Sequence, residues 1–163
     1  IDEAQQECPV CSITVLMYTY NKKILYASTC NGPACNCSMV FYNQKGKSFL
    51  AKELPQTAQT SCIRSIIDYD IDSDGKTDLI TAGNFYGTDV FLGRYDSSIG
   101  NVLMNDGNDQ LKNLPTAYSG FKAKGDVRRL LKIKSKSSTN IMVIKNNDLP
   151  EMIKIKSKTK DVQ

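Results

Sequence analysis

Short runs in which apolar and polar residues alternate dominate the chain, and polar turn signals separate them. An alternation with a period of two places apolar side chains on one face of a β-strand, and β-branched and aromatic residues favour that conformation. Segments such as "NKK", "CNGPACNC" and "QKGK" fall between the runs and have the composition of turns. The pattern predicts strands at residues 12–20, 24–29, 38–43, 48–54, 63–70, 77–84, 101–105, 127–133, 139–145 and 151–156.

No stretch shows a sustained helical period with a cap at each end. Many short strands with turns roughly every 8 to 12 residues are typical of an all-β sandwich or a β-propeller. Two hairpins are expected early in the chain, one from 12–20 with 24–29 and one from 38–43 with 48–54. The 163 residues suffice for one domain with a hydrophobic core.

The composition excludes several classes of function. No apolar run approaches the roughly 20 residues that a membrane helix needs. The polar start "IDEAQQE", without Met, is expected of a mature or processed chain that has no signal peptide in this form. The sequence has no histidine, which excludes Ser-His-Asp and Cys-His nucleophiles and His-containing zinc sites. An enzyme would have to use carboxylates, Lys, Tyr, Cys or a metal ion.

The charge is uneven along the chain. Residues 121–163 carry twelve Lys or Arg against four acids, whereas the first 120 residues are net acidic. A basic region raises the question of nucleic acid. In "LLKIKSK" and "MIKIKSK", however, the lysines alternate with apolar residues, as in a strand with one buried and one solvated face. Few aromatic residues are present there to stack on bases, so no nucleic-acid partner is expected.

The six cysteines all lie within the first 62 residues: Cys8, Cys11, Cys30, Cys35, Cys37 and Cys62. Three disulfides would indicate an oxidising compartment, whereas a Cys-only zinc site would be a structural metal centre. Six ligands exceed the four of a structural zinc site and no second CxxC pair follows "CPVC", so disulfides are favoured. A thioredoxin-type redox pair is disfavoured because "CPVC" is followed by the strand-like run "SITVLMYTY" rather than a helix.

The segment "DIDSDGKTD", residues 70–78, crowds four aspartates around one glycine. Asp70, Asp72, Asp74 and Asp78 occupy positions 1, 3, 5 and 9 of a loop, Gly75 occupies position 6, and Lys76 at position 7 can add its carbonyl oxygen. Gly75 permits the sharp turn that such a loop needs. Oxygen ligands without nitrogen or sulfur suit Ca²⁺, with Mg²⁺ or Mn²⁺ as weaker candidates. The expected cofactor is therefore Ca²⁺, in a structural rather than a catalytic role.

The loop is not an EF-hand, because Thr81 stands where that loop has a bidentate Glu and strand-like residues flank it on both sides. "DIDSDGKTDL" instead resembles the calcium loop of FG-GAP/VCBS repeats, the blades of integrin-alpha-type β-propellers. "LPQTAQTS", "AGNFYG", "GRYDSSIGNVLMNDG", "SGFKAKGDVR" and "IKNND" extend the resemblance, in the same order, to the C-terminal part of VCBS-repeat proteins of Bacteroidetes-type bacteria.

The resemblance covers roughly residues 43–156 and does not include the cysteine-rich stretch 1–42. It implies an all-β fold of partial propeller blades, with an FG-GAP/VCBS-like segment that contains the calcium loop at 61–163. The cysteines and the strand pattern, rather than the resemblance, predict a disulfide-rich β segment at 1–60. The resemblance also implies an extracellular, cell-surface or periplasmic location. The length suffices for about two or three blades, so a partner chain or further blades are expected to complete the assembly. The alternative is that the segments pack as a smaller open β unit with covered edges.

A polar and aromatic stretch that includes Asn84, Tyr86, Arg94 and Asp96 is a candidate ligand surface, although Arg94 and Asp96 could instead pair to fix a loop. The sequence thus favours a calcium-stabilised binding module for a protein or glycan partner. Two alternatives remain open. One is a carboxylate-dependent carbohydrate-active enzyme using Asp96 or Asp68, for which no second carboxylate stands apart from the calcium set. The other is a purely structural subunit of a surface complex.

Overall fold

A computed structural model describes residues 16–20, 23–28, 38–44, 47–91, 93–135 and 138–155. Within these residues the chain forms three open antiparallel sheets in sequence order. The first sheet contains β1 (Leu16–Tyr20), β2 (Lys23–Ser28), β3 (Met39–Asn43) and β4 (Phe49–Glu53). The second sheet contains β5 (Ser65–Tyr69), β6 (Asp78–Ala82), β7 (Asn101–Asn105) and β8 (Leu111–Leu114). The third contains β9 (Val127–Lys134), β10 (Thr139–Lys145) and β11 (Glu151–Ile155).

Each sheet is a meander in which consecutive strands pair, so the strand order follows the sequence. The all-β prediction is confirmed, and so are the two early hairpins, β1 with β2 and β3 with β4. The alternation did not predict β8, nor the single turns of helix η1 (Gln56–Gln59) and α1 (Thr116–Ser119). These elements are short, and "LKNL" of β8 contains only two apolar residues.

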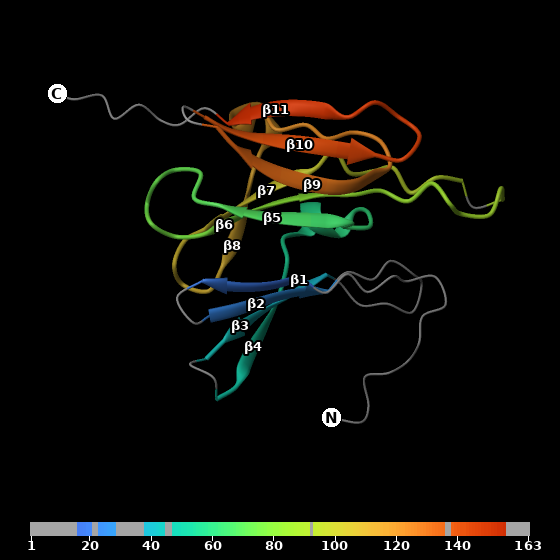
Figure 1. The fold of residues 1–163 in the computed structure, drawn as a ribbon. Coiled ribbons are helices and arrows are strands. Elements are labelled where there is room, and N and C mark those ends of the chain that lie inside the picture. Colours follow the sequence, from blue (N-terminus) through green and yellow to red (C-terminus); the bar gives the residue numbers. More distant parts are fainter. Residues whose placement is uncertain are drawn as a thin grey trace.

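The three sheets lie in layers, with the second sheet between the other two (Figure 1). One face of the second sheet, including Ile66, Leu79 and Leu103, packs against Val40 and Tyr42 of β3. Its other face, including Ile67, Ile80 and Val102, packs against the third sheet. Because side chains alternate between the faces of a strand, neighbouring residues of β5 and β6 enter different core clusters. All five residues of β6 are buried as a result.

Two polar contacts also join the second sheet to the third. The backbone N–H of Leu130 in β9 donates to the Ser65 hydroxyl oxygen at 2.9 Å. The Lys132 ammonium donates to both the carboxylate and the backbone carbonyl of Asp68, each at 2.8 Å. The expected boundary between residues 60 and 61 falls in the connection from the first sheet to the second, and the core that contains Val40 and Leu103 continues across it. That boundary stays a prediction.

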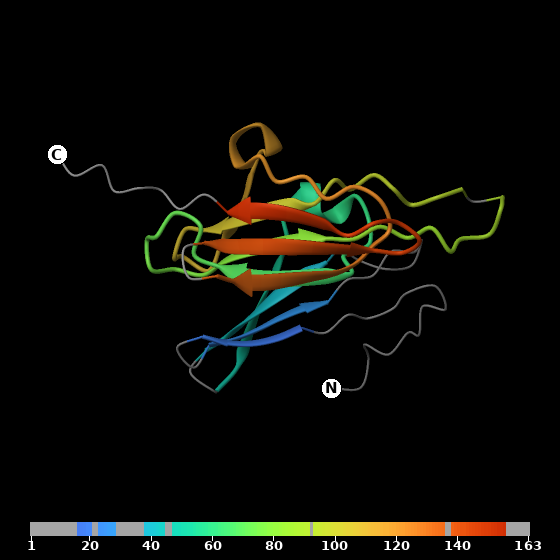
Figure 2. The same ribbon diagram turned by 45° about the horizontal axis from the view of Figure 1, so that its top comes forward.

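Between β6 and β7 the chain makes an excursion that extends away from the sheets in both ribbon views (Figure 2). At its base, Phe85 and Tyr95 exchange two backbone hydrogen bonds of 2.9 Å. Near its far end, Val90 and Phe91 are fully exposed. We call residues 85–95 the arm.

Candidate metal centre

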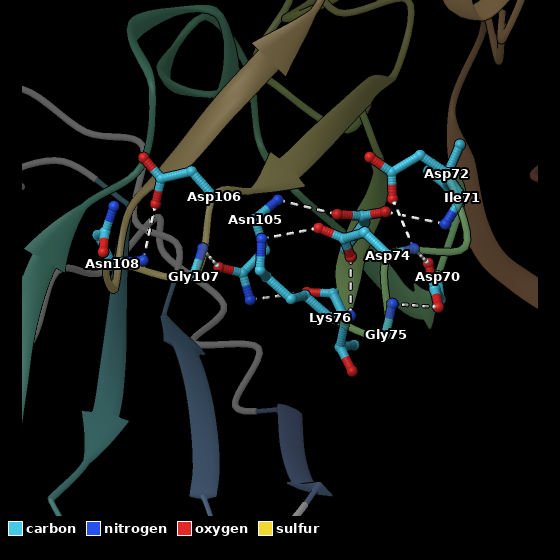
Figure 3. A network of polar contacts seen from close by, with 12 residues as sticks. Asp70, Ile71, Asp72, Asp74, Gly75, Lys76, Asn105, Asp106, Gly107 and Asn108 are labelled. Carbon is cyan, nitrogen blue, oxygen red and sulfur yellow. Dashed lines mark hydrogen bonds and ion pairs between the residues drawn. The ribbon is translucent and has the colours of Figure 1, made fainter.

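The acidic loop connects β5 to β6, and its carboxylates fold the loop upon itself (Figure 3). The two oxygens of Asp70 accept hydrogen bonds from the backbone N–H groups of Asp74, at 3.1 Å, and Gly75, at 3.0 Å. The N–H of Asp74 also lies 3.3 Å from a carboxylate oxygen of Asp72. Gly75 has φ +84°, a left-handed conformation that glycine adopts without steric cost. The sharp turn expected at position 6 of the loop is thus present.

Asp78 holds the loop to the rest of the second sheet. It is the first residue of β6 and only 1% exposed. One carboxylate oxygen accepts the N–H of Ile71 and the other accepts the N–H of Asn105, both at 2.8 Å. Burial raises the pKa of Asp78, the two backbone hydrogen bonds act in the opposite direction, and the nearby charges of Asp72 and Asp74 raise it further. A buried carboxylate in this position favours a cation beside it.

The carboxylates of Asp70, Asp72 and Asp78 converge, with one oxygen of each lying within 4.8 Å of the others. Oxygens on one Ca²⁺ ion lie about 2.3–2.6 Å from the metal, so two of them can be up to about 5 Å apart. The three carboxylates therefore fit around a single hard cation. Asp70 and Asp72 form no ion pair with any residue that the structure describes. That the cation is Ca²⁺ stays a prediction.

Asp74 does not join this cluster in the structure. Its carboxylate forms an ion pair of 2.8 Å with the ammonium of Lys76 and accepts the Lys76 backbone N–H at 2.8 Å. This contact lowers the pKa of Asp74 and raises that of Lys76. Asp74 could act as a metal ligand only after leaving Lys76, and its carboxylate would then have to rotate toward the cluster. The prediction that Lys76 contributes its carbonyl oxygen remains untested.

The hairpin between β7 and β8 supports the loop from the other side. The amide of Asn105 donates to the Thr77 carbonyl at 3.1 Å, while its oxygen accepts the N–H of Gly107 at 2.9 Å. The Lys76 stem packs against Gly107, since a Cβ at that glycine would lie 2.7 Å from the Lys76 Cε. The segment "NDGND", residues 105–109, has the Asp-Gly composition of a hairpin turn, and β7 and β8 pair on either side of it. Its role in holding the acidic loop was not foreseen.

The candidate ligand surface divides into two parts. Asn84 is buried: its oxygen accepts from the Ser61 hydroxyl and the Ser98 N–H, and its amide donates to the carbonyls of Ser98 and Gly125. This residue therefore ties three segments together and offers no group to a surface ligand. Arg94 stacks over the ring of Tyr86 at 4.8 Å. The structure shows this contact rather than an Arg94–Asp96 ion pair among the described residues, and Asp96 is exposed.

The other candidate residues lie apart from the acidic loop. Asp68, one of the two carboxylates considered for an enzyme, pairs with Lys132, and Asp96 lies beyond the arm. Cys62 is buried. The other five cysteines, Cys8, Cys11, Cys30, Cys35 and Cys37, lie outside the described residues, so the disulfides stay a prediction.

Comparison of the chain with protein-family models, with curated proteins and with solved structures gives no match. The described part of the chain contains no helix with the length and apolar character of a membrane span. The resemblance to FG-GAP/VCBS repeats therefore stays a prediction from the sequence motifs.

Proposed function

We propose that the chain is a calcium-stabilised binding module of the FG-GAP/VCBS type, secreted or held at a cell surface, whose sheets are blades of a larger propeller-like assembly. The observation that carries this proposal is the convergence of the Asp70, Asp72 and Asp78 carboxylates within 4.8 Å, without a cationic partner for Asp70 or Asp72 among the described residues. Three like charges held together are unfavourable unless a cation neutralises them.

The architecture supports the blade interpretation. Consecutive antiparallel meanders that stack face to face are the building plan of a propeller, and the first two sheets have four strands each, as a blade does. The three sheets do not close a ring, and among the described residues β1 and β11 are edge strands of the outer sheets. Open edges invite pairing or packing with another chain. A partner chain or further blades would cover these outer sheets.

The arm supports a role in binding rather than in catalysis. It presents Val90 and Phe91 to solvent on a base held by paired backbone hydrogen bonds and by the Arg94–Tyr86 stack. Neighbouring exposed apolar side chains on a projection of this kind are typical of protein contacts. No such observation favours the enzyme, because Asp68 is engaged by Lys132.

Thermal unfolding of the chain in EDTA, and then in increasing Ca²⁺ or Mg²⁺, tests the proposal. At a cation concentration 100 times the dissociation constant, binding to the folded state alone stabilises by about 2.7 kcal/mol. For a domain of this size, that corresponds to a Tm increase of roughly 5–10 °C. Asp72→Ala should abolish the increase, whereas Asp89→Ala, an exposed carboxylate in the arm, should leave it intact. If neither cation raises the Tm of the wild-type chain, the calcium-stabilised module is refuted.

A further inference from the structure

A cavity of about 570 Å³ lies between the first and second sheets, next to their edge strands β4 and β8. It is lined by residues of β3 and β4 on one side and by residues 109–113 on the other, so it is separate from the acidic loop. Cavities of roughly 300–1,000 Å³ hold small-molecule ligands. The chemistry of this lining indicates which class of ligand it fits.

Each wall of the cavity combines apolar side chains that belong to the core with polar side chains beside them. On the first wall, Lys52 stands opposite Val40 in the β3–β4 register and therefore shares the face that packs on the second sheet. On the second wall, Leu111 packs against the same core, and Asn113, two residues further on, lies on the same face of β8. Val40 and Leu111 thus provide an apolar floor, with an ammonium and an amide beside it.

Tyr42 also lines the cavity and carries an unsatisfied polar group. The residue is 5% exposed, and its hydroxyl has no hydrogen-bond partner among the described residues. An unpaired buried hydroxyl is rare in a protein, where a partner, an ordered water or a ligand normally meets it. The Tyr42 hydroxyl oxygen is itself buried, so a ligand reaches it only when side chains of the lining move aside. Lys52 is such a side chain, because among the described residues its ammonium contacts the Asn108 carbonyl at a distance of 3.5 Å and is exposed there. Burial raises the pKa of Tyr42, which keeps its hydroxyl a neutral donor.

The charges of the lining balance. Lys52 and Lys112 are matched by Glu53 and Asp109, so an anion or a cation would each meet two groups of its own sign. An apolar ligand would leave the Tyr42 hydroxyl and the Asn113 amide without partners. A neutral ligand with several hydroxyl groups can donate to the carboxylates and accept from the amides and ammonium groups.

We propose that this cavity binds a neutral saccharide, with Tyr42 and Asn113 as hydrogen-bonding residues and Val40 and Leu111 as the apolar surface beneath the sugar ring. The inference deepens the proposed function by naming the ligand class of the binding module. It does not require the cation, because no residue of the acidic loop lines the cavity.

Amide chemical-shift mapping of the full chain in Ca²⁺, with maltose, cellobiose, lactose and N,N′-diacetylchitobiose as separate probes, tests the inference. At least one disaccharide should shift the amide signals of Lys52 and of residues 109–113. Tyr42→Phe should weaken that binding roughly tenfold, the effect of one lost hydrogen bond. This variant should fold normally, because the hydroxyl that it removes has no partner in the part of the chain that the structure describes. Tyr118→Phe, on the exposed turn α1, is the matched control and should bind as the wild type does.

Shifts from none of the four disaccharides, shifts confined to other residues, or equal binding by Tyr42→Phe and the wild type would each overturn the inference. Repeating the titration in EDTA separates the two proposals. Saccharide binding in a chain that Ca²⁺ does not stabilise would refute the metal centre alone. Stabilisation by Ca²⁺ without saccharide binding would refute the cavity alone.

Discussion

Replacing Asp78 tests whether the acidic loop is held by its own hydrogen bonds as well as by a cation. Asp78→Ala removes the acceptor for two half-buried backbone donors, the N–H groups of Ile71 and Asn105. A hydrogen bond to a charged group contributes about 1.5–3 kcal/mol, so the two together contribute about 3–6 kcal/mol. Burial of the Asp78 charge, which raises the pKa of this carboxyl, offsets part of the stabilisation by the two hydrogen bonds. We therefore expect a loss near 3 kcal/mol in metal-free protein.

The assay is urea unfolding in EDTA, followed by circular dichroism under conditions that leave the cysteines in their native state. Asp78→Asn keeps one acceptor oxygen and should lose less than Asp78→Ala. Asp72→Ala is the control, since Asp72 is exposed and, among the described residues, accepts a single hydrogen bond, the 3.3 Å contact from the Asp74 N–H. Its metal-free stability should stay within about 0.5 kcal/mol of the wild type.

The same variants measured in Ca²⁺ separate the two roles of the loop. Both Asp72→Ala and Asp78→Ala should lose the stabilisation by the cation, because each removes one of the three converging carboxylates. Only Asp78→Ala should also be less stable than the wild type in the absence of Ca²⁺. If Asp78→Ala costs less than about 1 kcal/mol in EDTA, its two hydrogen bonds do not hold the loop, and the reasoning from the structure is wrong.

Three further predictions concern other contacts. Lys76→Met should bind Ca²⁺ more tightly than the wild type in calorimetry, because it releases Asp74 and removes a competing positive charge. Lys112→Met, which breaks the ion pair with Asp106 at 3.2 Å, is the control, and equal Ca²⁺ affinities of Lys76→Met and the wild type would contradict the prediction. Stability should fall above about pH 10, because Tyr42 and Lys145 have raised pKa values in the folded chain and keep protons that the unfolded chain releases at that pH. Tyr42→Phe should make this fall shallower in alkaline unfolding curves, and a curve equal to that of the wild type would contradict the prediction. Leu103→Ala, at a fully buried position in β7, should lower the free energy of unfolding in urea by about 2–5 kcal/mol, whereas Val90→Ala, at an exposed position, should lower it by less than about 0.5 kcal/mol. Similar losses of stability in the two variants would contradict the layered core.

The alternation of apolar and polar residues predicted most strands because each sheet face either packs on a neighbouring sheet or meets solvent. The spacing of Asp70, Asp72 and Asp78 along the sequence also predicted that they lie close together, since they belong to one connection between paired strands. The sequence could not predict that Asp78 accepts the N–H of Asn105, which lies 27 residues away. Nor could it predict that Lys76, considered only for its carbonyl oxygen, holds Asp74 with its ammonium.

Asn84 illustrates a limit of another kind. The segment "AGNFYG", in which Asn84 stands among glycines and aromatic residues, has the composition of an exposed loop. The Asn84 side chain is nevertheless buried and makes four hydrogen bonds. Its partners are Ser61, Ser98 and Gly125, which come together only in the fold. Burial of a polar side chain depends on such distant partners, and no local pattern reports them.

The position of Asp78 determines how far the effect of a bound cation would extend. Asp78 begins β6, an interior strand of the second sheet whose five residues are all buried. Through Ile71 it fixes the loop between β5 and β6, and through Asn105 it fixes the turn between β7 and β8. The two hairpins of the middle layer thus meet at one carboxylate. Because the first and third sheets both pack on this layer, a cation that orders the loop would stabilise the surface on which both outer sheets rest.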